Sequence, residues 1–113
     1  MGCVFCAIVT GEVEAAVVRR TEDVVVFLDR RPLFIGHCLV VPTTHHPTLA
    51  DLPPNTLGQY FGVVQEVARA LPVALEAEGT FVAMNNVISQ SVPHLHTHVV
   101  PRRRKDGLRG FFW

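Results

Sequence analysis

Residues 90–100 read Gln-Ser-Val-Pro-His-Leu-His-Thr-His-Val-Val, with histidines at positions 94, 96 and 98. Successive side chains of a β-strand point to opposite faces, so this spacing predicts a strand with all three imidazoles on one face. Leu95, Thr97 and Val99 would then occupy the other face. A lone histidine is most often an ordinary core or surface residue. Three at this spacing, beside a glutamine and a serine, indicate a functional site.

Two kinds of chemistry would use three imidazoles in a row. One is a three-histidine metal site, but His94 and His98 would lie roughly 13 Å apart along a straight strand. Because Zn–N bonds are only about 2 Å long, two neighbouring histidines can share an ion far more easily than all three. The other is nucleophilic catalysis, in which the middle imidazole attacks and its neighbours bind or protonate the substrate. A phosphate group fits this arrangement, because its oxygens point in different directions and can contact neighbouring imidazoles.

The rest of the chain predicts four more strands and two helices. Apolar residues 4–10, followed by Gly11, predict a short helix. A long helix is expected from the prolines at 53–54, passing Pro72 with a kink and ending at Gly79, because its apolar residues recur at helical spacing. Strands are expected at 17–20, 24–28, 37–41, 80–85 and 94–100.

Strands joined by short turns favour an α+β fold with a five-stranded antiparallel sheet, one long helix and a short N-terminal helix. The length of 113 residues predicts one domain spanning residues 1–113. Open strand edges in so short a chain predict a homodimer.

Composition narrows the functional classes. Apolar residues make up 49% of the chain, and ten Lys and Arg balance ten Asp and Glu. This balance gives no reason to expect nucleic acid or membrane as a partner. No apolar run approaches the roughly 20 residues of a spanning helix, and the N-terminus has no signal-peptide pattern, so a cytoplasmic protein is expected.

The histidine segment resembles the signature of the histidine triad (HIT) family of nucleotide-binding proteins. Residues 27–29, 36–42 and His45 form a second matching block, and residues 3–8 form a third. The three blocks follow the family's order over the whole chain. They are most similar to small bacterial members and to the nucleoside phosphoramidate hydrolase (Hint) branch, and residues 107–113 resemble an actinobacterial subgroup.

The resemblance implies a hydrolase that cleaves at the α-phosphate of purine nucleoside phosphoramidates or dinucleotide polyphosphates. His96 would attack the phosphorus and form a nucleotidyl-histidine intermediate that water then hydrolyses. His98 would hold the α-phosphate, with His37 behind it, and Ser91 and Gln90 would donate hydrogen bonds to phosphate oxygens and the leaving group. The neutral imidazole required of the nucleophile is available near pH 7 because an unperturbed histidine has a pKa of about 6.5.

The nucleotide site implied by the resemblance extends beyond the triad. Asp29 would accept hydrogen bonds from the ribose hydroxyls. Phe5, Ile8 and Phe27 would line an apolar slot for the base, although apolar residues at this spacing are also typical of core. Asn85 is a further candidate, but residues 85–90 are shorter than the family's glycine-rich segment and contain no glycine, which leaves open whether Asn85 or Asn86 reaches the substrate.

Cys3 and Cys6 form a Cys-x-x-Cys pair, which alone is compatible with two buried thiols, a redox pair or a metal site. In bacterial members of the resembled family, such a pair is joined by histidines that correspond to His45 and His94. Two thiolates and two imidazoles would form a closed, structural Zn²⁺ site. His46 is an alternative ligand. No organic cofactor is expected.

Three functions from different classes remain at this point. The first is the nucleotidyl-transfer hydrolase acting through His96. The second is a nucleotide-binding regulatory protein with weak or no catalysis, which the altered 85–90 segment favours. The third is a metalloenzyme with the triad histidines as metal ligands. The basic segment 102–105 is either a solvated surface or a means of steering polyphosphates.

Overall fold

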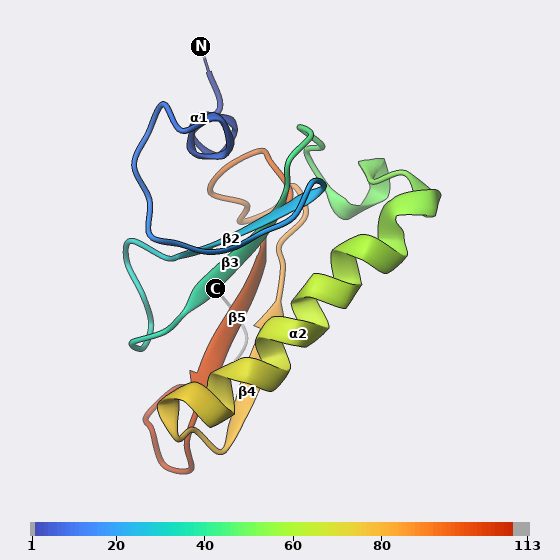
Figure 1. Cartoon of the computed structure of the whole chain (residues 1–113). Helices are drawn as coiled ribbons and strands as arrows, with labels where there is room; N and C mark the ends of the chain where they lie inside the picture. The colour runs from blue at the N-terminus through green and yellow to red at the C-terminus, as the bar shows by residue number, and fades with distance from the viewer. Residues whose placement is uncertain (1, 110–113) are drawn as a thin grey trace.

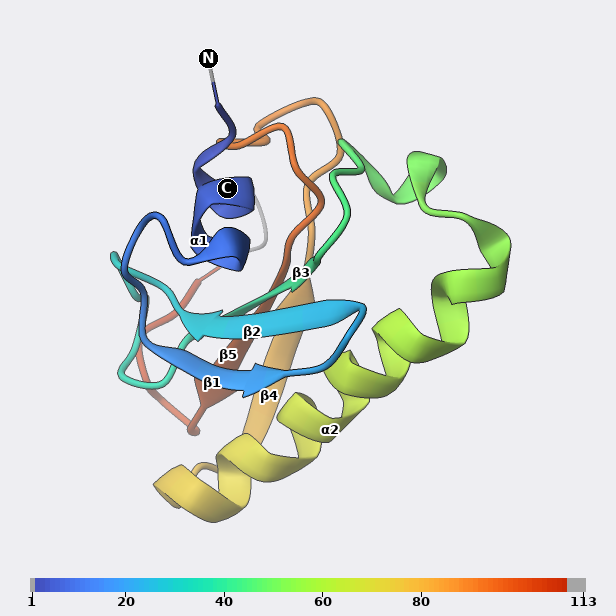
Figure 2. The same cartoon turned by 45° about the horizontal axis from the view of Figure 1, so that its top comes forward.

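The protein, described here by a computed structural model that covers residues 2–109, is a five-stranded sheet with a helix on each face (Figures 1 and 2). Residues 110–113, the end of the segment that resembles actinobacterial members, lie outside the described residues. The helices and strands in chain order are α1 (Val4–Thr10), β1 (Val17–Arg20), β2 (Val24–Leu28), β3 (Cys38–Pro42), α2 (Leu57–Leu75), β4 (Gly79–Ala83) and β5 (Thr97–Arg102). Two short 3-10 turns, η1 (Leu49–Asp51) and η2 (Pro54–Thr56), precede α2.

The strands lie in the order β1-β2-β3-β5-β4, and every neighbouring pair is antiparallel. Strand β2 shows how the two faces are used, because its buried side chains alternate between two apolar clusters. Val24 and Val26 pack in the cluster that includes the buried face of α2. Val25 and Phe27 pack in the cluster that includes α1. The predicted α+β sheet with one long and one short helix is confirmed.

Helix α2 ends earlier than the sequence predicts. It continues through Pro72, as expected, but it ends at Leu75, not at Gly79. Glu76 takes up a left-handed conformation with φ 54° and caps the helix, so the chain has already turned when Gly79 begins β4. The strand predicted at 37–41 is found one residue later, as Cys38–Pro42. The strand predicted at 80–85 begins one residue earlier and ends two residues earlier, as Gly79–Ala83.

The main correction concerns the histidine segment. The strand predicted at 94–100 begins only at Thr97, so His94 and His96 precede it and the three histidines do not share a strand face. The register pairs Val40 with Thr97, and its continuation would bring Leu95 opposite Pro42. Proline has no N–H to donate, so the ladder stops there. The Leu95 N–H instead donates to the carbonyl of His46 (2.7 Å).

The turn between β2 and β3 requires a glycine at position 36. Gly36 has a φ of 98°, and a Cβ at this position would collide with the side chain of Leu75. The glycine therefore lets the chain turn closely against α2 and enter β3 just after His37. Within the part of the chain that the structure describes, no helix combines the length and apolarity needed to cross a membrane.

Candidate active site

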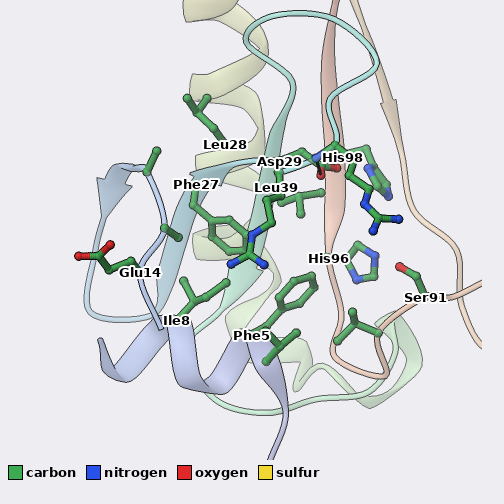
Figure 3. Close-up of a pocket in the computed structure, with 16 residues that line it drawn as sticks. Phe5, Ile8, Glu14, Phe27, Leu28, Asp29, Leu39, Ser91, His96 and His98 are labelled. Atoms are coloured by element: carbon green, nitrogen blue, oxygen red, sulfur yellow. Dashed lines mark hydrogen bonds between the residues drawn. The ribbon is translucent and has the colours of Figure 1, made fainter. Parts of the chain in front are cut away.

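A cavity of about 390 Å³ opens between α1, the end of β2 and the histidine segment. Figure 3 shows His96, His98 and Ser91 at one end and Glu14 at the other, with Phe5, Ile8 and Phe27 between them. The cavity thus has a polar end and an apolar middle. It brings together residues from five separate segments of the chain, and they include seven of the ten predicted catalytic and nucleotide-binding residues.

The apolar middle is built by α1 against β2. Phe5 and Ile8 are three residues apart, so they lie on the same face of the helix. Both are buried, and the Phe5 ring meets the Phe27 ring edge to face with centroids 5.4 Å apart. These three side chains belong to the core and also line the cavity, so the two interpretations of them are compatible.

The position of the proton on His96 follows from its hydrogen bond. His96 Nδ1 lies 2.8 Å from the carbonyl oxygen of His94, and a carbonyl can only accept, so Nδ1 carries the proton. In the neutral ring, the lone pair is therefore on Nε2. The ring is 2% exposed and packs edge to face against Phe5, with centroids 5.1 Å apart. An oriented, unprotonated Nε2 is what nucleophilic attack requires.

His37 and His98 form a chain of hydrogen bonds behind the cavity. The Leu33 N–H donates to His37 Nδ1 (3.0 Å), so a neutral His37 carries its proton on Nε2. That proton is donated to His98 Nδ1 (2.9 Å), which leaves the proton of His98 on Nε2. The chain therefore provides an N–H donor at His98, a group that also lines the cavity.

Asp29 lies at the end of this chain. One of its carboxylate oxygens is 3.5 Å from His37 Nε2, and the other accepts the Arg31 N–H (2.9 Å). Asp29, His37 and His98 could be taken for a metal site because their ligand atoms lie close together. The hydrogen bonds argue otherwise, since both His37 nitrogens and Nδ1 of His98 are already engaged within the protein.

Burial keeps the two histidines of this chain neutral. Burial, together with the neighbouring His96 and His37, lowers the pKa of His98 to about 4, while Asp29 opposes the shift. Burial also lowers the pKa of His37, again against the attraction of Asp29. The cause is the cost of moving a charged imidazole out of water. At neutral pH His37 and His98 are therefore uncharged and act through hydrogen bonds.

The structure places Ser91 and Gln90 differently. Ser91 is exposed and lines the cavity beside His96. The Gln90 amide instead donates to the Pro47 carbonyl (2.6 Å) and accepts the Val87 N–H (2.9 Å). Gln90 therefore holds the 85–90 segment against the loop after β3, and it is not among the described residues that line the cavity.

The two asparagines of this segment also bond to the protein. The Asn85 amide donates to the Ser89 carbonyl (3.2 Å), and the Asn86 side-chain oxygen accepts the Leu49 N–H (2.7 Å). Neither lines the main cavity, and Asn85 lines a smaller cavity on the far side of His98.

Cys3, Cys6, His45 and His94 converge beside the N-terminus of α1. The distances from Cys3 Sγ and Cys6 Sγ to His94 Nδ1 are 3.4 and 3.5 Å, from Cys6 Sγ to His45 Nδ1 3.3 Å, and between the two Nδ1 atoms 3.2 Å. A tetrahedral zinc ion with Zn–S bonds of about 2.3 Å and Zn–N bonds of about 2.0 Å separates its ligands by roughly 3.3–3.8 Å.

The orientation of His94 supports the same fit. Its Nε2 lies 2.9 Å from the Pro42 carbonyl and must donate to it, so Nδ1 has no proton and directs a lone pair toward the cysteines. A hydrogen bond of this kind commonly orients a metal-binding imidazole. The residues present therefore fit a closed zinc site, and His46 is not in the cluster.

A sequence model of the HIT domain matches residues 10–105 of the chain. The protein belongs to the HIT family. It is 39% identical over 110 residues to a HIT-like protein of Mycobacterium tuberculosis described as uncharacterized, an alignment that spans 96% of this chain and 76% of the relative. It is also 30% identical over 117 residues to an adenosine 5′-monophosphoramidase of Candida albicans, spanning 98% of this chain and 77% of that protein.

Solved structures give the same result. A zinc-bound histidine triad family protein from Mycobacterium smegmatis superposes with a TM-score of 0.90 and 44% identity, over 96% of this chain and 81% of that one. The family assignment drawn from the three sequence blocks is therefore confirmed. In this HIT protein the two cysteines and two histidines of the predicted metal site lie together in one cluster. The Mycobacterium smegmatis protein is described as zinc-bound.

Several residues around the cavity were not predicted from the sequence. Glu14, Arg30, Arg31 and Leu39 line it, and the Leu33 N–H fixes the proton position of His37. Arg30 and Arg31 directly follow Asp29, so their position next to a candidate residue was a usable signal. No sequence pattern near Glu14 or Leu33 indicated a role at the site, because both residues lie in loops whose course the sequence does not predict.

Proposed function

We propose that this HIT protein hydrolyses nucleotides at the α-phosphorus through a covalent intermediate on His96. The substrate class is purine nucleoside phosphoramidates or dinucleotide polyphosphates. The observation that carries the proposal is the hydrogen bond from His96 Nδ1 to the His94 carbonyl (2.8 Å), which leaves Nε2 as the unprotonated atom of a buried ring at the cavity.

In the first step, His96 Nε2 forms a bond to phosphorus as the bond to the leaving group breaks. The N–H of His98 donates to a phosphate oxygen and stabilises the charge that grows there in the transition state. A leaving amine takes up one proton, for which the Ser91 hydroxyl is the candidate donor. Water then attacks phosphorus, breaks the bond to His96 and leaves its hydroxyl on the nucleoside monophosphate, while its second proton restores the serine.

The nucleoside would occupy the apolar middle of the cavity. Phe5 and Ile8 from α1 and Phe27 from β2 offer a slot in which a purine can stack, and a cavity of about 390 Å³ falls in the size range of small-molecule sites. Asp29 would accept from the ribose hydroxyls through the carboxylate oxygen that faces His37. Gln90, whose amide is engaged by Pro47 and Val87, would contact substrate only after that segment moves.

Rapid-quench intact-mass measurement tests the proposal. With adenosine phosphoramidate, the wild type should show a transient adduct of one AMP and release AMP, while His96→Ala should show neither but still bind AMP by calorimetry. His46→Ala, outside the cavity, should behave as wild type. Turnover retained by His96→Ala would exclude this mechanism.

A nucleotide-binding regulatory protein is the second candidate. The engagement of Gln90 and both asparagines in the 85–90 segment favours it, because few amide donors then remain for a leaving group. It predicts AMP binding without adduct or release from either phosphoramidates or diadenosine polyphosphates. The same experiment therefore separates the two.

The Cys3, Cys6, His45 and His94 cluster would hold a structural Zn²⁺ ion. When bound, the ion would link the start of α1 to the loop after β3 and to the histidine segment, which keeps Phe5 against His96. Metal content measured by mass spectrometry should be about one zinc per chain. His45→Ala should lose it, and His46→Ala should retain it.

We also propose a homodimer. Strands β1 and β4 are the two edges of the sheet, and an open edge can pair with another chain. Light scattering coupled to gel filtration gives the mass directly, and a monomer over the working concentration range would exclude the dimer.

A further inference from the structure

The end of the main cavity farthest from the histidines carries a carboxylate. Glu14, in the loop between α1 and β1, lines the cavity together with Ala15 and Ala16. Figure 3 shows Ile8 and Phe27 between Glu14 and the histidine end, with the carboxylate turned outward. Glu14 is exposed, and its side chain makes no hydrogen bond or ion pair with a described residue. Rotation about its side-chain bonds therefore costs no contact and can bring the carboxylate to a ligand.

The orientation of a bound nucleotide follows from the proposed contacts at its phosphate. With phosphorus at His96 Nε2 and the ribose at Asp29, the base lies in the apolar slot in the middle of the cavity. In a purine nucleotide, ring atoms N1, C2 and C6 lie across the base from the bond to the ribose. This edge therefore points away from the histidines, toward the end of the cavity that Glu14 lines.

A carboxylate at that edge distinguishes the two purines. It has two oxygens that accept hydrogen bonds and no hydrogen to donate. Guanine presents N1–H and the N2 amino group side by side, so it can donate to both oxygens at once. Adenine presents only its N6 amino group, and its unprotonated N1 directs a lone pair at the second oxygen. Hydrogen bonds to an ionised acceptor are stronger than neutral ones, so the difference favours guanine.

Two arginines of the same cavity act in the same direction. Arg30 and Arg31 follow Asp29 directly and line the cavity with it. A guanidinium only donates hydrogen bonds. Guanine offers it two acceptors on one edge, N7 and O6, whereas adenine offers N7 alone. Neither arginine takes part in an ion pair among the described residues. The charged groups at the cavity thus match the donors and acceptors of guanine.

The other group of basic residues is engaged elsewhere. Arg102 and Arg104 pair with acidic neighbours at 2.6 and 3.1 Å, and Arg103 donates to a backbone carbonyl at the end of α2. None of the three is among the described residues that line the cavity. These contacts favour the interpretation of segment 102–105 as a solvated surface, so this segment does not contribute to base recognition.

We propose that Glu14 recognises the edge of the base and that the protein prefers guanine nucleotides to adenine nucleotides. The inference rests on the hydrolase function proposed above and names the base of its substrate. Glu14 has no part in the chemistry at phosphorus, so it determines specificity and is not a catalytic residue. Adenine nucleotides still bind, because the apolar slot and the phosphate contacts serve both purines.

Calorimetric titration with GMP, IMP and AMP tests the proposal. IMP keeps the N1–H of guanine but lacks the N2 amino group, so it should have intermediate affinity. The wild type should bind GMP at least about fivefold more tightly than AMP, which is the lower end of the discrimination that a bidentate contact to a base supplies. The lower end applies because Glu14 is exposed and water competes for its oxygens. Equal dissociation constants for GMP and AMP would overturn the proposal.

Glu14→Gln is the decisive variant. An amide has one acceptor and one donor, which match N6–H and N1 of adenine, so the preference should reverse in favour of AMP. The ratio of the two dissociation constants is the readout, since loss of a negative charge affects all three monophosphates alike. A purely structural role for Glu14 would not reverse this ratio. If Glu14→Gln keeps the wild-type ratio, Glu14 does not recognise the base.

Glu12→Gln is the matched control. Glu12 lies in the same loop and is also exposed, but it accepts from the Thr10 hydroxyl and is not among the described residues that line the cavity. It should keep the wild-type ratio. A reversal in Glu12→Gln as well would show a general effect of charge and would overturn the assignment to Glu14.

The outcomes separate this inference from the function on which it rests. If adenosine and guanosine phosphoramidates both give the adduct, but with equal kcat/KM and equal affinity of their monophosphates, only base recognition is refuted. If GMP binds more tightly through Glu14 but neither compound gives an adduct, base recognition is supported and the hydrolase function fails. If neither GMP nor AMP binds, both proposals fail.

Discussion

Protonation of His98 should destabilise the fold well above the pH at which carboxylates titrate. Burial lowers the pKa of His98 to about 4 from an ordinary value of 6.5. The folded state therefore favours the neutral ring, and the unfolded chain binds the proton first as the pH falls. The stability that His98 contributes is complete above about pH 6.5 and is lost progressively as the pH falls toward 4.

The size of the effect follows from linkage. Between pH 7.5 and pH 5, these two pKa values correspond to a loss of about 2 kcal/mol in the free energy of unfolding. Replacing His98 by Gln removes the titrating group but leaves an amide that can still accept from His37. The wild type should thus lose about 2 kcal/mol more than His98→Gln over this pH range.

Urea unfolding followed by circular dichroism at pH 7.5, 6 and 5 measures this difference. Acid-sensitive groups that do not contact His98, including the Cys and His cluster, are common to both proteins and cancel in the comparison. His46→Gln, outside the chain of hydrogen bonds at His37, should keep the wild-type dependence. Parallel pH curves for wild type and His98→Gln would refute the reasoning, because His98 would then have the same pKa in both states.

Further predictions concern the parts of the fold that hold the site in place. The buried Tyr60 hydroxyl bonds to Thr97 (2.6 Å), so Tyr60→Phe should lower the free energy of unfolding by about 1–2 kcal/mol in urea titrations. Gly36→Ala should cost about 2 kcal/mol or more in the same assay, because the left-handed turn is strained and the new Cβ meets Leu75. Cys6→Ser should lower both the zinc content and the melting temperature, and unchanged metal content would contradict the proposed ligand set.

Much of the secondary structure could be predicted because local patterns determine it. The β-branched runs of β1 and β2 and the helical spacing in α2 each depend on side chains that are near neighbours in the chain. The end of α2 could not be predicted, since Glu76 adopts a left-handed conformation that glycine usually provides. The start of β5 depends on its partner strand, because Pro42 on β3 ends the ladder opposite the histidine segment.

By itself, the sequence was sufficient to identify the HIT family and seven of the sixteen described residues that line the main cavity, because the family's motifs are short contiguous segments. The resemblance already implied that His94 joins the cysteines and that His96 and His98 face the phosphate. Only the tertiary structure decided the proton positions, because His96 Nδ1 bonds to the His94 carbonyl and His98 accepts from His37. Only tertiary structure showed the smaller cavity on the far side of His98, with a lining from residues as far apart as 33 and 100. Such features depend on contacts between distant segments of the chain. Strand pairing and side-chain packing create these contacts, and a local sequence pattern does not predict them.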